Sequence, residues 1–114
     1  MMVKVEAIIR PQRLDAVREA LDDAGLNGMT VTEAHGHGRQ KGYVQRYRGA
    51  EYAVTLRQKV RVETVVNEAD AERVVSLIRR VAQTGEIGDG KIFVTPILDV
   101  IRIRTSERGE AALR

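Results

Sequence analysis

The two halves of this chain carry the same pattern, and this repeat limits the folds available to the chain more than any other feature. Val3–Ile9 aligns with Val60–Val66, and both runs have the length and the β-branched content of a strand. Each run is followed by a segment whose apolar residues recur at helical spacing, and in the same alignment Leu21 falls on Ile78. The chain is therefore predicted to contain one strand–helix unit in two copies.

Signals for the ends of two helices accompany this periodicity. The first predicted helix has Pro11 at its start and Gly25 just past its end, as the backbone preferences of these residues favour. Its apolar face is formed by Leu14, Val17, Leu21 and Ala24. The second predicted helix is capped by Asn67 or Asp70 and ends near Gly85. Its apolar face is formed by Val74, Leu77, Ile78 and Val81.

A second strand is expected after each helix. These strands are Met29–Ala34 and Lys91–Arg104, the latter interrupted by Pro96. The order strand, helix, strand, long connection, strand, helix, strand is that of the split double βαβ arrangement in ferredoxin-like domains. We therefore predict a single α+β domain over residues 1–114, with an antiparallel sheet, two helices on one face and a long loop between the second and third strands.

The second face of this sheet bears on the oligomeric state. Two helices can cover only one face of a sheet, so the other face must either tolerate water or be buried by another subunit. Apolar residues occur at both alternating positions of the repeated strands: Val5 and Ile9 alternate with Ile8, and Val65 adjoins Val66. This pattern argues against water on either face and predicts a homo-oligomer.

Composition excludes several classes of protein. The chain has no cysteine, which removes disulfides and thiolate chemistry. No apolar run approaches membrane-spanning length and no signal-peptide pattern opens the sequence, so we expect a cytoplasmic protein. The net charge is +3, and much of the excess lies in one segment that contains Arg39, Lys41, Arg46 and Arg48. This distribution favours a local contact with an anion over a broad nucleic-acid-binding face.

The glycine-rich segment at residues 84–91 is typical of a phosphate-binding loop. Three of its residues are glycines, which allow positive φ angles and let backbone N–H groups approach an anion. Lys91 closes the segment, and Arg102 and Arg104 follow on the predicted strand. Residues two apart on a strand project to the same side, so one ligand could meet both arginine forks. The segment is predicted to hold a polyphosphate, the alternative being a plain turn between helix and strand.

Four segments of the chain form a recognisable set. They are residues 38–42 (GRQKG), 47–52 (YRGAEY), 84–94 (TGEIGDGKIFV) and 101–105 (IRIRT). By these segments, their order and their spacing, the whole chain resembles the PII signal-transduction proteins of the GlnB and GlnK type. The resemblance implies a homotrimer of ferredoxin-like subunits that senses nitrogen, carbon and energy status, with nucleotide sites in the clefts between neighbouring subunits.

The resemblance also implies that ATP and ADP compete for each of these clefts. The positions that match the phosphate contacts of the family are Gly88, Asp89, Gly90, Lys91, Arg102, Arg104 and Arg39. The positions that match the segment lining the adenine are Gly28, Met29 and Thr30. In such a site backbone N–H groups hold the phosphates, while lysine and arginine side chains from two chains neutralise them.

Mg²⁺ and 2-oxoglutarate are the further effectors that the resemblance implies, both bound together with ATP. Gln40 matches the glutamine that holds the metal with the ATP phosphates and the keto acid. Lys59 matches the lysine that pairs with the far carboxylate, and Lys41 and Gly88 complete the keto-acid site. A keto acid that chelates through a carboxylate and a keto oxygen suits a hard cation. No redox cofactor is implied.

The long loop, residues 36–55, is implied to be the part of the protein that its targets recognise. Bound effectors are expected to change the shapes that this loop populates, without a covalent reaction. Arg48 matches an arginine that enters the pore of ammonium transporters. Tyr52 matches a tyrosine that some relatives uridylylate or adenylylate. The alternative for Tyr52 is a ring that packs at the base of the loop. The implied partners are an ammonium transporter, glutamine synthetase or its modifying enzymes, so that a membrane is reached only through a transporter. In the C-terminal segment, residues 102–114, Ser106 stands where glycine is common in the family.

Two other classes of function fit the sequence less well. An RNA-binding ferredoxin-like module would need aromatic residues on its central strands to stack bases, whereas these strands are aliphatic apart from Phe93. A nucleotide-dependent enzyme would need a general base near the phosphates, and neither His35 nor His37 falls in that segment. We interpret these histidines as solvated residues at a strand end. We therefore expect a regulatory protein without a nucleic-acid partner that hydrolyses ATP slowly at most.

Overall fold

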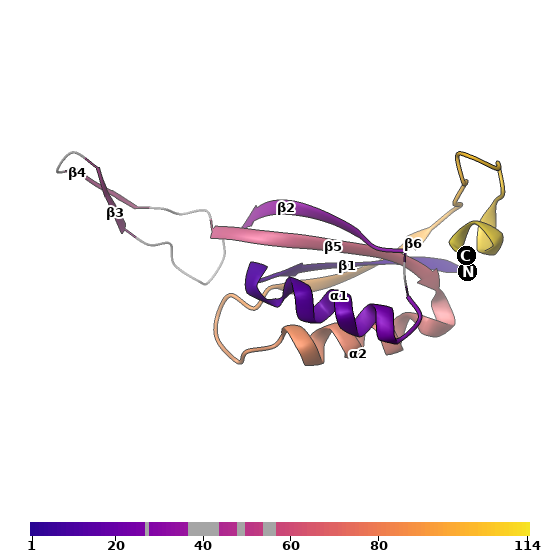
Figure 1. Cartoon of the computed structure of the whole chain (residues 1–114), viewed down its shortest axis with the longest axis horizontal. Helices are drawn as coiled ribbons and strands as arrows, with labels where there is room; N and C mark the ends of the chain where they lie inside the picture. Colours follow the sequence, from indigo (N-terminus) through magenta and orange to yellow (C-terminus); the bar gives the residue numbers. More distant parts are fainter. Residues whose placement is uncertain (27, 37–43, 48–49, 54–56) are drawn as a thin grey trace.

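The computed structural model describes residues 1–26, 28–36, 44–47, 50–53 and 57–114. Its main body is a sheet with two helices (Figure 1). The strands of the sheet are β1 (Met2–Ile9), β2 (Thr30–Gly36), β5 (Arg57–Asn67) and β6 (Lys91–Ile97), and the helices are α1 (Leu14–Asp23) and α2 (Glu68–Ala82). The described residues thus confirm the expected α+β, ferredoxin-like order of elements.

The sheet is antiparallel and has the strand order β2-β5-β1-β6. The first strands of the two repeats, β1 and β5, occupy its centre, and the second strands, β2 and β6, form its edges. The register places Val5 opposite Thr64 on one side and Val94 on the other. Because side chains alternate along each strand, this register decides which residues share a face.

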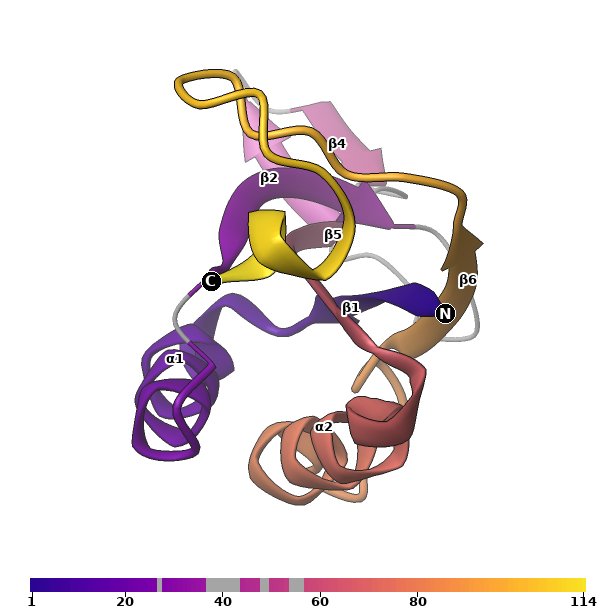
Figure 2. The same cartoon turned by 90° about the vertical axis from the view of Figure 1, so that its right-hand side faces the viewer.

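Both helices pack against the same face of the sheet (Figure 2), as the sequence predicts. Alternate residues of β1 and β5 are buried beneath them, from Val3 to Ile9 and from Val60 to Val66. The helices contribute the apolar residues that the repeat pairs, and Leu21 and Ile78 are each about 1% exposed. The core is thus aliphatic, and the burial of these side chains is the main stabilising contribution to the fold.

The ends of the helices follow the predicted signals. Pro11 begins a short 3₁₀ turn that leads into α1, and Gly25 follows the end of that helix with a φ of 80°. Asn67 occupies the N-cap position of α2, but its side chain makes no capping hydrogen bond. In the part of the chain that the structure describes, neither helix combines the length and apolar character needed to cross a membrane.

The open face of the sheet differs from the sequence-based expectation. Ile8 and Val65 do lie on it, but its centre is charged. Ion pairs link Lys4 Nζ to Glu6 (3.6 Å) and Glu63 (3.9 Å), and Arg61 Nε to Glu6 (3.4 Å) and Glu63 (3.9 Å). The expectation of an apolar open face was wrong for the centres of β1 and β5, where charged residues occupy this face, although Phe93 lies opposite Glu6 on β6.

Two segments depart from the predicted strands. The long connection contains a small hairpin, in which β3 (Val44–Tyr47) pairs with β4 (Ala50–Ala53). The predicted strand Lys91–Arg104 ends at Ile97, because the chain then turns and only an isolated bridge, Ile101 with Arg108, follows. The C-terminal segment ends in a 3₁₀ helix, Gly109–Leu113.

Candidate functional site

The glycine-rich segment connects α2 to β6 and adopts the backbone shape that its glycines predict. Gly85, Gly88 and Gly90 have φ angles of 88°, 104° and 96°, in the region that other residues rarely adopt. Gly90 has a second reason to be glycine. A Cβ atom built on it would lie 1.6 Å from the carbonyl oxygen of Ile8, so the loop backbone rests directly on the end of β1.

The carboxylate of Asp89 fastens this loop to its own beginning. Its Oδ2 accepts hydrogen bonds from the backbone N–H groups of Thr84 (2.8 Å) and Gly85 (2.9 Å). Its Oδ1 accepts from the hydroxyl of Thr84 and from Nε of Arg10 (3.0 Å), at the end of β1. The hydroxyl of Thr84, its N–H and the Arg10 guanidinium hold the pKa of the Asp89 carboxyl well below its usual range. The group therefore stays ionised at acidic pH values at which an ordinary Asp is protonated.

Two cations hold consecutive carbonyl groups of the loop. Arg10 Nη2 donates to the carbonyl oxygen of Ile87 (2.9 Å), and Lys59 Nζ donates to that of Gly88 (2.6 Å). Lys59 lies on β5 and is 8% exposed. Burial lowers the pKa of its ammonium group, Arg10 and Arg57 lower it further, and Asp89 partly offsets them.

These contacts fix the direction of two backbone N–H groups of the loop. In a trans peptide the C=O and N–H groups point in opposite directions, so the N–H groups of Gly88 and Asp89 point away from the two cations. Among the described residues no acceptor is found for the N–H of Gly88, while Ile87 and Gly88 form a hydrogen-bonded turn that leads to Asp89. Successive N–H groups of this kind form an anion-binding concavity.

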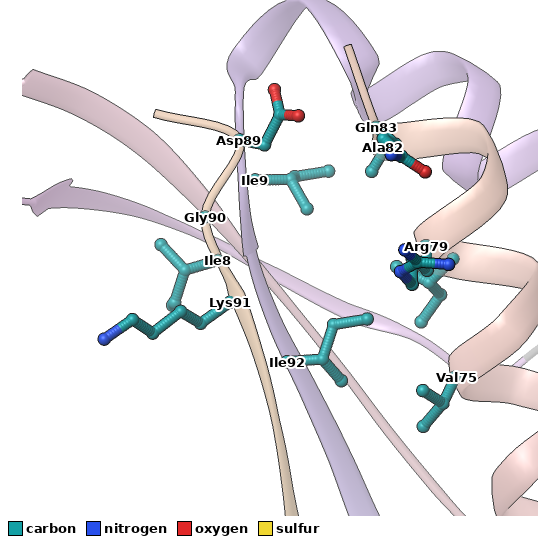
Figure 3. A pocket seen from close by; sticks show the side chains of 11 residues that line it. Ile8, Ile9, Val75, Arg79, Ala82, Gln83, Asp89, Gly90, Lys91 and Ile92 are labelled. Atoms are coloured by element: carbon teal, nitrogen blue, oxygen red, sulfur yellow. The ribbon is translucent and has the colours of Figure 1, made fainter. Parts of the chain in front are cut away.

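Lys91 follows the loop at the start of β6. Its side chain extends away from α2 (Figure 3), on the face of the sheet that the helices leave open. A groove of about 380 Å³ lies on the other side, between α2 and the start of β6. Its walls are mainly apolar, with Arg79, Gln83 and Asp89 among the lining residues. Gly90 and Lys91 thus separate the groove from the open face.

The three residues predicted to line an adenine lie together in a second cavity, of about 440 Å³. Gly28, Met29 and Thr30 share it with residues of β1, β5 and the C-terminal 3₁₀ helix. The other lining residues are Lys4, Glu63, Thr64, Val65, Ala112 and Leu113. The hydroxyl of Thr64 donates to the carbonyl oxygen of Gly28 (2.8 Å) and ties the segment to β5.

Arg102 and Arg104 do not lie on a strand. The prediction that their side chains project to the same side of a strand was therefore wrong. They fall in a turn, in which the N–H of Ser106 donates to the carbonyl of Arg102 (2.8 Å) and Ser106 has a φ of 63°. The Arg102 guanidinium donates to Glu107 Oε1 (2.7 Å) and to the carbonyl oxygen of Ala111 (3.4 Å). It also donates to the carbonyl oxygen of Arg114. Arg102 is therefore attached to the C-terminal segment that borders the second cavity.

The candidate residues thus divide into two groups at opposite ends of the sheet. One contains the glycine-rich loop, Lys91 and Lys59, and the other contains the second cavity and Arg102, next to the C-terminus (Figure 1). Arg39, Gln40, Lys41 and Arg48 lie outside the described residues, and so does His37. The backbone of Tyr52 pairs with Gln45 in the hairpin, and His35 is exposed on β2.

Sequence reasoning missed Arg10 and the side chain of Thr84. The Arg10–Asp89 contact joins residues 79 apart in sequence, and no local pattern marks it. Only the pairing of β1 with β6, which carries the end of β1 to the loop, brings the two together. Within the described ranges, no cluster of three histidine, aspartate or glutamate residues could hold a metal ion.

Comparison with known proteins gives a consistent result. The family model described as "Nitrogen regulatory protein P-II" matches residues 2–107. Over 112 residues the chain is 54% identical to the nitrogen regulatory protein P-II of Azospirillum brasilense and 58% identical to that of Rhizobium meliloti, covering 98% of this chain and 100% of each relative. A crystal structure of Arabidopsis thaliana PII bound to citrate superimposes with a TM-score of 0.81 at 42% identity, covering 99% of this chain and 90% of that one.

Proposed function

Because this chain belongs to the nitrogen regulatory P-II family, we propose that it is a signal-transduction protein that binds ATP or ADP between two copies of itself. The observation that carries the proposal is the division of the candidate residues into two groups. The loop group offers N–H donors and Lys91, whose side chain points away from the groove that adjoins the loop. The cavity group offers a pocket and Arg102, with Arg104 in the turn that follows, but no anion-binding loop. A neighbouring copy would supply to each group what it lacks.

The proposed assembly is a homotrimer. Apolar side chains are exposed along β6 and the segment after it, which is unusual for a monomer and supports burial against a second copy. They are Phe93 (50%), Val94 (49%), Leu98 (102%), Ile101 (48%) and Ile103 (98%). Nucleotide bound across such interfaces would stabilise the assembly by mass action.

In the proposed site the phosphates are held chiefly by the loop backbone. The N–H groups of Gly88, Asp89 and Gly90 act as donors, and Lys91 supplies charge. Arg102 and Arg104 of the adjoining copy complete the neutralisation, while Gly28, Met29 and Thr30 of that copy contact the adenine. Arg39 is the further phosphate contact that the family resemblance implies. This arrangement binds a nucleotide and positions no general base, so we propose a regulatory protein with slow ATP hydrolysis at most.

We further propose that 2-oxoglutarate binds with Mg²⁺ beside the ATP phosphates. Gln40 would supply an amide oxygen to the metal, and Lys41, Lys59 and Gly88 would bind the keto acid. The contact of Lys59 with the Gly88 carbonyl supports their joint use. The Arabidopsis relative is described as bound to citrate, which is also a small polycarboxylate. The ion would serve to bridge the keto acid and the nucleotide.

The output of the proposed signal is the shape of residues 36–55. This segment would contact an ammonium transporter or an enzyme of nitrogen metabolism, with Arg48 as a contact residue and Tyr52 as a site for modification. Coupling between effectors and targets is reciprocal, so a target that prefers one shape of the segment also changes the affinity for ATP. Such a protein would work in the cytoplasm.

A mixing experiment tests the position of the nucleotide site. The variant Lys91→Gln damages only the loop group and Arg104→Gln only the cavity group, so each alone is expected to lose most ATP binding in calorimetry. Copies of the two variants that are unfolded and refolded together form mixed oligomers. In these, some interfaces combine an intact loop with an intact cavity, and ATP binding is partly restored. A mixture that binds no better than either variant would place the site within one chain, and wild-type protein that gives no heat with ATP would overturn the function.

A further inference from the structure

The carboxylate of Asp89 has no capacity left for a ligand. An ionised carboxylate offers about four acceptor positions. Each oxygen of Asp89 already accepts two hydrogen bonds, from Thr84 N–H and Gly85 N–H on Oδ2 and from the Thr84 hydroxyl and Arg10 on Oδ1. A negative group at the centre of a proposed phosphate loop repels the ligand, and the ion pair with Arg10 (3.0 Å) partly offsets that repulsion.

Arg10 connects this carboxylate to the orientation of the next peptide. Its Nε donates to Asp89 Oδ1 (3.0 Å) while its Nη2 donates to the carbonyl oxygen of Ile87 (2.9 Å). One guanidinium therefore fixes both the position of Asp89 and the direction of the Ile87–Gly88 peptide, whose N–H points the opposite way. Arg10 is itself held in place by β1, which ends at Ile9.

We propose that Arg10, Asp89 and Thr84 form an internal clasp that holds the glycine-rich loop in its anion-binding shape before a ligand arrives. The proposal rests on the proposed function and deepens it, because it assigns to Asp89 and Arg10 the role of positioning residues that act through the loop backbone. A connection with three glycines loses much conformational freedom when it becomes ordered. Ordering it in advance through side chains that the ligand does not touch raises the affinity for phosphate groups.

The clasp predicts a loss of affinity that is confined to phosphate-bearing ligands. In Asp89→Asn an amide replaces the carboxylate and removes two of the four acceptor positions and the charge. We expect the affinity for ATP to fall about tenfold or more, the effect of losing hydrogen bonds to a charged group. Affinity for adenosine, which has no phosphate, is expected to stay within about twofold of wild type, since an effect on one site leaves the other unchanged.

Two further variants separate positioning from simple charge. Arg10→Gln should weaken ATP binding, and the double variant with Asp89→Asn should be no weaker than Asp89→Asn alone, because both changes break one unit. Arg10→Lys keeps the charge but can reach only one of the two acceptors, so it is expected to restore binding in part. The control is Arg18→Gln, which removes an exposed Arg–Asp pair on α1 (3.2 Å) and should leave all affinities unchanged.

Amide hydrogen exchange on the full-length protein tests the clasp without any nucleotide. The N–H groups of Thr84 and Gly85 should be protected in wild type and in Arg18→Gln, and exchange faster in Asp89→Asn. Equal losses of ATP and adenosine affinity, unchanged ATP affinity, or unaltered exchange at these two amides would each overturn the clasp. Wild-type protein that binds no ATP while the two amides lose protection in Asp89→Asn would instead overturn the proposed function and leave the clasp as a feature of the loop alone.

Discussion

The chain leaves its two helices in different ways, although the helices are equivalent in the repeat. After α1, Gly25 takes a positive φ, and the N–H groups of Gly25 and Leu26 donate back to the carbonyls of Asp22 and Leu21. This main-chain motif ends the helix compactly and leads directly toward β2. After α2 the chain continues extended at Gln83, and the carboxylate of Asp89 binds the first N–H groups of the connection.

The difference shows how one topology can hold two kinds of loop. When main-chain carbonyls satisfy the N–H groups after a helix, the connection is short and none of these donors faces a ligand. When a side chain satisfies them, the following peptides can turn outward and offer their own N–H groups. The cavity beside Gly28 and the loop around Gly88 therefore occupy corresponding places in the two halves, but only the second has the form of an anion site.

The largest expected effect on the free energy of unfolding comes from a substitution in the connection after α2, and the described residues of the connection after α1 have no equivalent of it. In Gly90→Ala the new Cβ would lie 1.6 Å from the carbonyl oxygen of Ile8, which belongs to a central strand and cannot move freely. We expect a loss of about 4 kcal/mol in the free energy of unfolding, at the upper end of single substitutions. Urea denaturation at a fixed protein concentration measures it. A loss no greater than that of Gly85→Ala would mean that the loop does not rest on β1.

The two helices themselves should respond alike. Leu21→Ala and Ile78→Ala remove equivalent side chains, each about 1% exposed, from the same core. Each is expected to lower the free energy of unfolding by about 3 kcal/mol, the usual cost of removing such a side chain and leaving a cavity. If urea denaturation gives values that differ by more than a factor of about two, a spread beyond that of similar core sites, the repeat does not extend to the packing of its helices.

A smaller effect tests the glycines that follow each helix. Gly25 and Gly85 have φ angles of 80° and 88°, and a Cβ on either would meet no atom within 4 Å. Only backbone strain remains, so each Gly→Ala change should cost about 1 to 2 kcal/mol. Thermal unfolding of the two variants side by side checks the equality. A much larger cost at Gly85 would show that a side chain destabilises the loop after α2 more than it destabilises the turn after α1.

The sequence predicted the helices, the central strands and the positive φ angles of the loop glycines, since all of these follow from local periodicity and residue type. It did not predict the turn at Arg102 and Arg104. That turn depends on the bridge between Ile101 and Arg108 and on the contact of Arg102 with Glu107, neither of which is visible before the chain has folded back. Arg10 escaped notice for the same reason, because its partner Asp89 comes close only through the β1–β6 pairing.

The charged centre of the open sheet face shows a related limit. Alternation along one strand identifies two faces but not their neighbours, and the expectation of an apolar second face came from Ile8 and Val65 alone. The register sets Glu6 opposite Glu63, with Lys4 and Arg61 on either side of this pair as counter-charges. Such cross-strand ion pairs make a polar face stable, and they can be recognised only when the register is known.

The smallest expected effect concerns the connection between α1 and β2. A change there should weaken the binding of different ligands from those weakened by breaking the clasp. Thr64→Val keeps the shape of a side chain that is 5% exposed but removes its hydrogen bond to the carbonyl of Gly28 (2.8 Å). The free energy of unfolding should fall by about 1 kcal/mol, the net value of one neutral hydrogen bond. Because Gly28 lines the second cavity, calorimetry should show weaker binding of adenosine and ATP alike. Binding of inorganic tripolyphosphate, which has no adenine to place in that cavity, should be unchanged. Asp89→Asn is expected to weaken tripolyphosphate and spare adenosine. If both variants weaken the same ligands, the two connections do not act as separate halves of one site.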